Sequence, residues 1–348
     1  MSQTPLPLGL EPTRFETLQG WAADDHAAAF RAFLRSCHAD PQLPHAEEAF
    51  ALGPEVSAGV ARAFFEDRFA PHVVAEPSTP GFVTGYYEPE IDGSYVRGGP
   101  FQVPVYRRPG DLITLAPDAE RARFNDRITG MRQTREGLVP YCTRAEIWNG
   151  ALAGRGLELL YLTDDVELFY MQVQGSGLVR LREGGTVRLH YDGKNGHPYS
   201  SIGRLLVERG EIAIDAMSMA AVKAWLRADP VRGRALMEEN LSYVFFRALD
   251  PEEERDGPRG AQDVALTPGR SLAVDTAYHR LGLPVFVTAE ALMTEKGQPF
   301  RRLMIAQDVG SAIRGPERGD IFWGTGEAAG AIAGITRHAA RFHVLLPK

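Results

Sequence analysis

Residues 307–326, QDVGSAIRGPERGDIFWGTG, are the stretch around which the rest of the chain is organised. They include two aspartates, Asp308 and Asp320, and five glycines. Glycine lets the backbone take positive φ values and approach a ligand closely, so this density predicts a tightly wound, irregular segment. The apolar residues 302–306 predict a strand before it, and residues 327–334 predict a short helix after it. We therefore expect both aspartates to lie in loops beside rigid elements, where catalytic side chains are common.

Asp320 is followed directly by residues 321–323, which are Ile, Phe and Trp. A carboxyl group beside aromatic and apolar surface loses hydration, which disfavours the charged form and raises the pKa. A raised pKa suits a general acid. The alternative is that Asp308 and Asp320 are turn residues whose side chains bond their own backbone. The chemistry of the residues leaves both interpretations open.

Residues 81–90, GFVTGYYEPE, predict a strand that ends at Pro89. Within it, Tyr86 and Tyr87 offer aromatic faces that can stack on sugar rings, and Glu88 offers a carboxylate that can accept hydrogen bonds from hydroxyl groups. The alternative is a strand edge with tyrosines at the surface.

Residues 168–174, LFYMQVQ, are predicted as a strand with an apolar back and a front that carries Gln172 and Gln174. The strand is expected to end in a turn at Gly175, with Ser176 beside it. Glutamine amides donate and accept hydrogen bonds together, which suits sugar recognition. The alternative is a half-exposed antiparallel strand with no role in binding.

Several local signals predict helices and structural residues. Asp24 or Asp25 can cap a helix whose apolar face includes Cys37, so Cys37 is expected to be a buried free thiol. Pro54 is expected to open a second helix. Thr143 and Glu146 form a capping-box pattern. His197 is expected to be a structural residue in a turn. The second cysteine, Cys142, belongs to no metal-ligand pattern.

The composition is that of a globular protein with a turn-rich, β-dominated fold. The chain has 348 residues, 36 of them glycine and 24 proline, and its length favours two domains. A net charge of −7 argues against nucleic acid as a partner. No apolar run approaches the roughly 18 residues of a membrane span. Residues 1–12 show none of the regions of a signal peptide, so the sequence does not indicate export by that route.

Five strings resemble the membrane-bound lytic transglycosylase A family, whose members cleave the glycan strands of peptidoglycan. The resemblance covers about residues 81–345, and it departs from the family pattern at residues 278–282, where an Ile-Pro-Leu-Gly-like stretch is expected. The strings that carry it are residues 81–90, 138–147 (LVPYCTRAEI), 170–177 (YMQVQGSG), 194–199 (KNGHPY) and 307–326.

The resemblance implies a mainly β fold with packing helices. Residues 1–92 and 251–348 are expected to form a discontinuous catalytic domain with a double-psi β-barrel. Residues 93–250 are expected to form an inserted second β-barrel domain, with a groove for a glycan chain between the two domains.

The resemblance also implies the reaction, which is cleavage of the bond between N-acetylmuramic acid and N-acetylglucosamine with formation of a 1,6-anhydromuramic acid end. Asp320 corresponds to the catalytic aspartate, acting first as acid and then as base, and Asp308 is expected to support it. No metal or cofactor is needed. The residues expected to bind the glycan are Tyr86, Tyr87, Glu88, Gln172, Gln174 and Ser176.

Family members are exported and often lipid-anchored, so the resemblance implies a periplasmic protein associated with the outer membrane. The implied partner is the peptidoglycan strand, and further partners are expected among proteins of cell-wall synthesis or of the outer membrane. The enzyme is expected to be a monomer.

Three alternatives compete with this interpretation. A glycoside hydrolase would need a second carboxylate, for which Glu88 is the candidate. A glycan-binding module would need only the tyrosines and glutamines. An aspartic protease is suggested by Asp275 within residues 275–277 (DTA), but residues 308–310 (DVG) are a poor second copy of such a loop.

Overall fold

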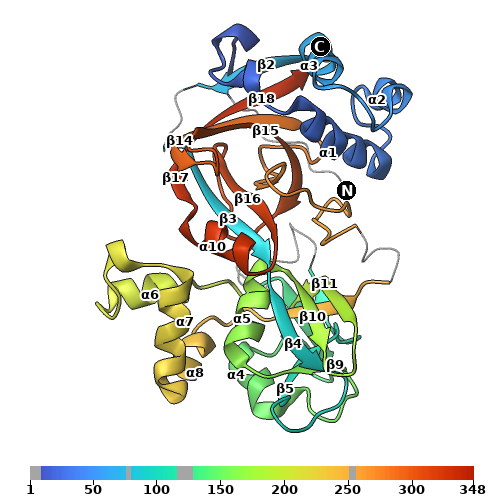
Figure 1. Cartoon of the computed structure of the whole chain (residues 1–348). Coiled ribbons are helices and arrows are strands. Elements are labelled where there is room, and N and C mark those ends of the chain that lie inside the picture. The colour runs from blue at the N-terminus through green and yellow to red at the C-terminus, as the bar shows by residue number, and fades with distance from the viewer. Residues whose placement is uncertain (1–8, 76–79, 116–127, 251–255) are drawn as a thin grey trace. The chain divides into compact units, whose positions relative to one another are not determined.

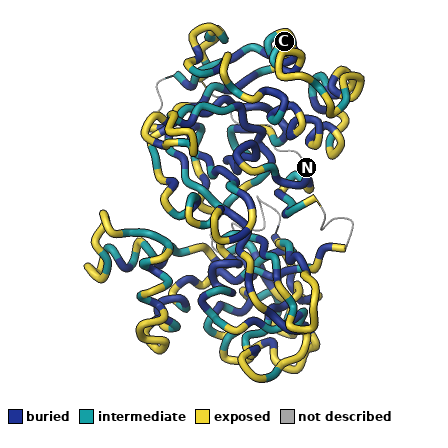
Figure 2. The backbone as a smooth tube through the Cα atoms, in the orientation of Figure 1, coloured by how far each residue is buried: buried dark blue, intermediate teal, exposed yellow. Residues whose placement is uncertain are grey.

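A computed structural model describes residues 9–75, 80–115, 128–250 and 256–348 (Figure 1). The chain divides into two units. The first consists of Met1–Tyr87 and Asp256–Lys348, and the second is Glu88–Arg255. The first has one sheet and the second has two, and in each unit the buried residues lie inside and the exposed residues outside (Figure 2). Two expectations from the family resemblance stay predictions. These are the exact domain boundaries and the interlocked chain crossings of a double-psi β-barrel.

A nine-stranded mixed sheet forms the first unit. Most neighbouring strands in it are antiparallel, whereas β13 and β15 are parallel. In sheet order the strands are β1 (Leu10–Pro12), β2 (Phe69–Val74), β18 (Arg341–Pro347), β14 (Pro284–Met293), β15 (Pro299–Val309), β13 (Ser271–Val274), β16 (Arg318–Thr325), β3 (Phe82–Glu88) and β17 (Arg337–Ala339).

Helices pack on this sheet, and the first of them lies against β15 (Figure 1). Asp25 caps it as predicted, because its side chain accepts a hydrogen bond from the backbone N–H of Ala28. The helix predicted to open at Pro54 begins at Ala58 instead, because the Ser57 hydroxyl supplies the N-cap. The helices are α1 (His26–Ala39), α2 (Ala46–Leu52), α3 (Ala58–Arg68) and α10 (Glu327–Ile335), with 3-10 turns at Phe15–Thr17 and Trp21–Ala23.

The second unit has a six-stranded sheet and a three-stranded sheet. The order of the larger is β12 (Val244–Ala248), β11 (Thr186–Lys194), β10 (Ser176–Leu181), β4 (Glu90–Ser94), β9 (Glu158–Leu162) and β5 (Val103–Tyr106). The smaller contains β6 (Ile113–Thr114), β7 (Gly130–Thr134) and β8 (Gly137–Pro140). The helices are α4 (Arg144–Glu146), continued by a π-helical turn at Ile147–Ala151, then α5 (Asp165–Gln174), α6 (Ile202–Glu208), a 3-10 turn at Ile214–Ala216, α7 (Met219–Ala228) and α8 (Pro230–Glu238).

The strand prediction for residues 168–174 is wrong, because these residues belong to the helix α5. Asp164 caps its start by accepting from the backbone N–H of Val166, and Gly175 ends it in the left-handed conformation. A short run that alternates apolar and polar residues does not separate a strand from a buried helix. The flanking aspartate and glycine are the signals that decide for the helix.

The loop prediction for the two aspartates is also wrong. Asp308 lies near the end of β15, and Asp320 lies inside β16. Gly319 is a strand residue whose missing side chain makes room for packing, since a Cβ there would lie 2.9 Å from Leu272 and 3.0 Å from Phe342. The glycine density therefore reflects close packing as well as turns.

Other local predictions are confirmed. Thr143 and Glu146 form the capping box. Cys37 is a buried free thiol, and so is Cys142 in the second unit. His197 is buried, with its Nε2 2.7 Å from the carbonyl oxygen of Tyr141. Among the residues that the structure describes, no helix is both long and apolar enough to cross a membrane.

Candidate active site

The central strand β13 separates the two aspartates that the sequence singles out. Ala273 of β13 pairs with Asp308 on one side and with Asp320 on the other. Since neighbouring strands lie about 4.8 Å apart, the two aspartate Cα atoms are about 10 Å apart. Ala273 carries only a methyl group, so β13 places no larger side chain at this level of the sheet.

Hydrogen bonds use both carboxylate oxygens of Asp308. Its Oδ2 accepts from the Tyr86 hydroxyl at 2.8 Å. Its Oδ1 accepts from the backbone N–H groups of Ala261 and Val309, each at 2.9 Å. Three donors from three separate segments therefore fix this carboxyl group in one orientation.

Asp320 has a different environment. Its Oδ1 accepts from the Arg318 guanidinium at 2.8 Å, whereas no hydrogen bond from the described residues reaches its Oδ2. Both side chains are partly exposed, at 20% for Arg318 and 23% for Asp320. Arg318 is itself held by Thr84, whose hydroxyl accepts at 2.8 Å, and by the carbonyl oxygen of Gly319. One oxygen of Asp320 is thus left to meet a ligand.

Burial raises the pKa of both carboxyl groups. For Asp308 it raises the pKa to about 6, against the opposing effect of the three hydrogen bonds, and the charge of Asp320 adds to the rise. Burial raises the pKa of Asp320 also, although the charge of Arg318 and its hydrogen bond lower it. The direction for Asp320 is the one that the apolar residues 321–323 predict. The pair can hold a proton closer to neutral pH than ordinary aspartates can.

Tyr86 links the two carboxyl groups electrostatically. Its ring centroid lies 5.3 Å from that of Phe322, and its hydroxyl donates to Asp308. Burial raises the pKa of the Tyr86 hydroxyl well above its usual value, and the charges of both aspartates raise it further. The neutral hydroxyl is therefore a dependable donor in this site.

Tyr87, the next residue, points into the core of the first unit. It is 7% exposed, and a Cβ on Gly330 of α10 would lie 2.7 Å from its ring. The structure brings Tyr86 to the aspartates but covers Tyr87 with a helix. The role predicted for Tyr87 in binding sugar stays a prediction, with no open ring face to support it.

The remaining predicted binding residues belong to the second unit and are mostly buried. Glu88 is fully buried and accepts from Arg188 Nε at 2.8 Å. Gln172, 5% exposed, accepts from Arg144 at 2.6 Å and donates to the carbonyl oxygen of Val244 at 3.0 Å. Both side chains therefore form hydrogen bonds inside the second unit.

Gln174 and Ser176 lie on either side of the glycine that ends α5. Gln174 is half-buried at the end of the helix, and Ser176 is 8% exposed at the start of β10. Their predicted contact with a glycan stays a prediction.

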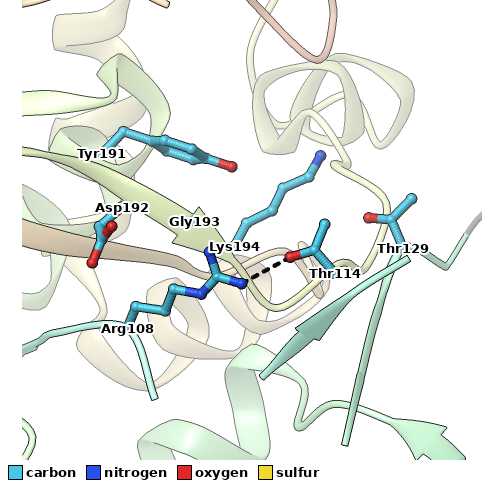
Figure 3. A pocket seen from close by; sticks show the side chains of 7 residues that line it. All are labelled: Arg108, Thr114, Thr129, Tyr191, Asp192, Gly193 and Lys194. Carbon is cyan, nitrogen blue, oxygen red and sulfur yellow. Dashed lines mark hydrogen bonds between the residues drawn. The ribbon is translucent and has the colours of Figure 1, made fainter. Parts of the chain in front are cut away.

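Two functional candidates escaped the sequence analysis. Arg318 stands two residues before Asp320, and residues i and i+2 of a strand point to the same face, so their spacing held the signal. The second is a pocket of about 330 Å³ in the second unit. Its residues are far apart in sequence, so no local pattern could reveal it. It is lined by Arg108, Thr114, Thr129, Tyr191, Asp192, Gly193 and Lys194 (Figure 3).

The described part of the chain contains no group of three or more His, Cys, Asp or Glu residues that could hold a metal ion. Asp275, the residue that suggested an aspartic protease, is 4% exposed and accepts from the backbone N–H groups of Ala277 and Gly315. Its carboxylate fixes the chain before β16.

Comparisons with known proteins agree with one another. The sequence family described as the MltA specific insert domain matches residues 82–247, and the 3D domain matches residues 270–346. Membrane-bound lytic murein transglycosylase A of Escherichia coli K12 is 35% identical over 267 residues, which are 75% of this chain and 64% of that protein. The protein of the same name from Vibrio cholerae is 34% identical over 265 residues, 74% of this chain and 63% of that protein. The chain thus spans about 64% of the length of its E. coli relative.

Solved structures cover the chain more fully. A membrane-bound lytic murein transglycosylase from Agrobacterium tumefaciens has 36% sequence identity and a TM-score of 0.88, over 97% of both chains. MltA from Neisseria gonorrhoeae has 33% identity and a TM-score of 0.82, over 99% of this chain and 97% of that one. E. coli MltA with bound chitohexaose has 28% identity and a TM-score of 0.71, over 99% and 96%. The chain belongs to the membrane-bound lytic murein transglycosylase A family.

Proposed function

We propose that this protein is a lytic transglycosylase that cleaves the bond between N-acetylmuramic acid and N-acetylglucosamine in peptidoglycan and leaves a 1,6-anhydromuramic acid end. The observation that carries the proposal is the unequal pair of carboxyl groups beside Ala273. Asp308 has hydrogen bonds on both oxygens, whereas no described residue bonds to Oδ2 of Asp320. The names of the relatives and the chitohexaose-bound E. coli structure support the same activity.

In the first step, protonated Asp320 donates its proton to the glycosidic oxygen. Burial supports this role, because it raises the pKa of Asp320 and so increases the protonated fraction. A glycan that covers the site removes further water and strengthens the effect. Arg318 then stabilises the carboxylate that forms, since its guanidinium lies 2.8 Å from Oδ1.

In the second step, the Asp320 carboxylate accepts the proton of the C6 hydroxyl of the muramic acid, and the C6 oxygen forms a bond to C1. The bond from C1 to the leaving oxygen breaks, and no water is consumed. Asp320 returns to its protonated form. Asp308 and Tyr86 act as positioning residues, which keep this face of the sheet polar and ordered.

A glycoside hydrolase is less well supported. It would need a second carboxylate that activates water or attacks the sugar. Glu88 was the candidate, but its carboxylate is fully buried and paired with Arg188. A buried, paired carboxylate is a poor base for an incoming water molecule.

We also propose that the first unit is the catalytic domain and that the protein works in the cell envelope, on the periplasmic side and in association with the outer membrane. The words "membrane-bound" in the names of the relatives support the envelope location. Its partner would be the glycan strand, with proteins of cell-wall synthesis or of the outer membrane as further partners, and the enzyme would act as a monomer.

Mass spectrometry of peptidoglycan fragments tests the activity. The wild-type protein should release fragments with anhydromuramic ends, and Asp320→Asn should release almost none. Fragments with reducing ends would make the protein a hydrolase. If a folded wild-type protein released nothing from several peptidoglycan preparations, the proposed activity would be wrong.

A further inference from the structure

The pocket of the second unit has no part in the chemistry proposed above. Its volume of about 330 Å³ lies within the usual range of small-molecule sites, at the lower end. None of the residues predicted to bind the glycan lines it. Four of its residues come from the end of β11, and the other three are Arg108, Thr114 and Thr129.

The backbone at the end of β11 is irregular. The pairing of β11 with β12 shifts register between Tyr191 and Lys194, which marks a β-bulge. Gly193 within it has φ +124°, a value that other residues rarely adopt. A Cβ on Gly193 would lie 3.4 Å from Cδ and 3.6 Å from Nη1 of Arg108. These are ordinary contact distances, so it is the positive φ, and not a lack of space, that favours glycine at this position.

Arg108 is anchored at one end of its guanidinium. Nη2 donates to the carbonyl oxygen of Leu112 at 3.3 Å and to the Thr114 hydroxyl at 3.1 Å. No hydrogen bond to a described residue uses Nε or Nη1, and the side chain is exposed. These two hydrogen bonds hold the guanidinium in place beside the cavity.

Figure 3 shows how the other groups are arranged. The hydroxyl of Tyr191, the ammonium of Lys194 and the hydroxyl of Thr129 surround the same space as Thr114 and the Arg108 guanidinium. Asp192 also lines the cavity, and Figure 3 shows its carboxylate on the same side of the strand as the Arg108 guanidinium. No ion pair joins Asp192 to Arg108 in the described part of the chain. Two cations, three hydroxyl groups and one carboxylate thus line one cavity.

Such a set of groups favours an anion. Nε and Nη1 of Arg108 can each donate a charge-assisted hydrogen bond to a carboxylate oxygen, and the lysine adds a second positive charge. The exposed ring of Tyr191, 42% accessible, offers an apolar face for the carbon skeleton next to the anion. The net charge of −7 on the whole chain disfavours a long polyanion such as nucleic acid.

We propose that this pocket binds a carboxylate carried by a substituent of the glycan strand. The proposal rests on peptidoglycan being the substrate and adds a recognition site to it. Two sources of the carboxylate exist on such a strand, the stem peptide and the lactyl group of muramic acid. In either case the second unit distinguishes substituted strands from plain N-acetylglucosamine polymers.

Binding measurements on the full chain test the proposal. Isothermal titration calorimetry in the Asp320→Asn background, which prevents cleavage, would use three probes. These are a disaccharide-tetrapeptide muropeptide, a muramic acid-containing oligosaccharide without peptides, and chitohexaose, which has no carboxylate. The variants are Arg108→Gln and Lys194→Gln. Arg107→Gln is the matched control, because Arg107 is also exposed but lies outside the pocket.

Arg108→Gln should weaken binding of at least one carboxylate probe about tenfold, as expected for the loss of a charge-assisted hydrogen bond. Lys194→Gln should weaken it less. Binding of that probe should also fall as salt is added, because exposed charges are screened. Chitohexaose should bind all variants about equally. Loss for the muropeptide alone assigns the stem peptide, and loss for the peptide-free oligosaccharide alone assigns the lactyl group. Loss for both probes shows that the pocket accepts either carboxylate.

Equal effects of Arg108→Gln and Arg107→Gln on both carboxylate probes would overturn the proposal, as would an equal loss for chitohexaose. The test of carboxylate binding can fail independently of the test of the proposed cleavage activity. If the wild-type protein produces anhydro ends while Arg108→Gln binds every probe normally, only this inference fails. If the wild-type protein does not cleave but the Arg108 effect appears, only the proposed activity fails.

Discussion

The aspartate pair of the first unit and the pocket of the second unit differ in how far their charged groups are exposed to solvent. In the first unit, Asp308 and Asp320 are partly buried, and burial raises the pKa of each. In the pocket of the second unit, Arg108 is exposed and Tyr191 is 42% exposed. Burial changes which protonation state is present, whereas exposed charges keep their protons and attract opposite charges. The first arrangement suits proton transfer and the second suits recognition.

The contrast also predicts how each region responds to conditions. Interactions of the partly buried carboxyl groups are poorly screened, so their chemistry should depend on pH more than on salt. Interactions at the open pocket should depend on salt more than on pH. Each experiment below changes one side of this comparison and leaves the other as a control.

The largest effect is expected from Asp320→Asn. An asparagine cannot donate or accept a proton in the reaction, and loss of a general acid or base costs about 10²- to 10⁴-fold in rate. The measurement is the release of anhydro-ended fragments per unit time. Chitohexaose binding serves as the control and should change little. If cleavage fell less than about tenfold, Asp320 would not be the proton donor.

A smaller loss, about 10- to 100-fold in rate, is expected from Asp308→Asn, because the asparagine disturbs a positioning contact and removes no proton donor. Tyr86→Phe, which removes the hydroxyl bonded to Asp308, should give a similar but weaker effect. If Asp308→Asn abolished cleavage while Asp320→Asn remained active, the two roles would be reversed.

Asp308 also predicts a pH dependence of stability. Burial raises its pKa in the folded protein from 3.8 to about 6, so the folded state binds this proton more tightly than the unfolded chain. The resulting stabilisation is complete below the unfolded pKa and is lost as the pH rises through about 6. Asp308→Asn should therefore reduce the change in Tm between about pH 4 and pH 7. An unchanged pH dependence would show that Asp308 is not the group that titrates.

Gln172 tests whether a residue predicted to bind glycan has a structural role. Gln172→Ala leaves the buried Arg144 guanidinium without one acceptor and should reduce the free energy of unfolding by about 2 kcal/mol. Urea unfolding measures this. Val173→Ala is the control, because Val173 is 40% exposed on the same helix, and it should change stability by less than about 0.5 kcal/mol. Weakened chitohexaose binding at unchanged stability would restore the binding role.

The smallest effect is expected from Arg318→Gln. Arg318 lowers the pKa of Asp320 through its charge and its hydrogen bond. Its removal should raise that pKa further and move the high-pH limb of the rate profile to higher pH. Arg318→Lys should move it less. Arg314→Gln, at an exposed position paired with Asp275, is the control and should leave the profile in place.

The sequence predicted elements whose signals are local. Residues 302–306 lie in a strand, and residues 327–334 lie in a helix, because apolar patterning and an alanine-rich run carry that information over a few residues. The capping box of Thr143 and Glu146 is another short-range signal. The family resemblance indicated the fold class and the proposed activity from whole strings of residues.

Residues 168–174 show where local reasoning failed. Their alternation fits a strand, but helix α5 buries residues 168–171 together with Gln172 and leaves Val173 exposed. Buried Arg144 accounts for this, because its guanidinium needs an acceptor inside the unit and Gln172 provides one. A polar residue on an apparent polar face can thus be a core residue when a distant charge requires it.

The environment of the aspartates could not be derived from their own stretch. Tyr86 and Ala261, which both bond to Asp308, are 222 and 47 residues away in sequence. The pocket is similar. Arg108 follows β5, which is four strands from β11 in the sheet order, and the two regions come together because β5 also contacts β12, the neighbour of β11. Strand order and register set these contacts, and neither is visible in a single sequence.

The two cysteines give each unit an internal reporter of local opening. Cys37 lies in the first unit and Cys142 in the second, and both thiols are buried and free. Burial raises the pKa of Cys37 to about 12 and raises that of Cys142, so neither reacts readily with a thiol reagent while its surroundings are closed. In the Cys142→Ala protein the labelling rate of Cys37 would therefore report how often the first unit opens. In the Cys37→Ala protein the labelling rate of Cys142 would report the same for the second unit, and neither experiment needs an introduced cysteine.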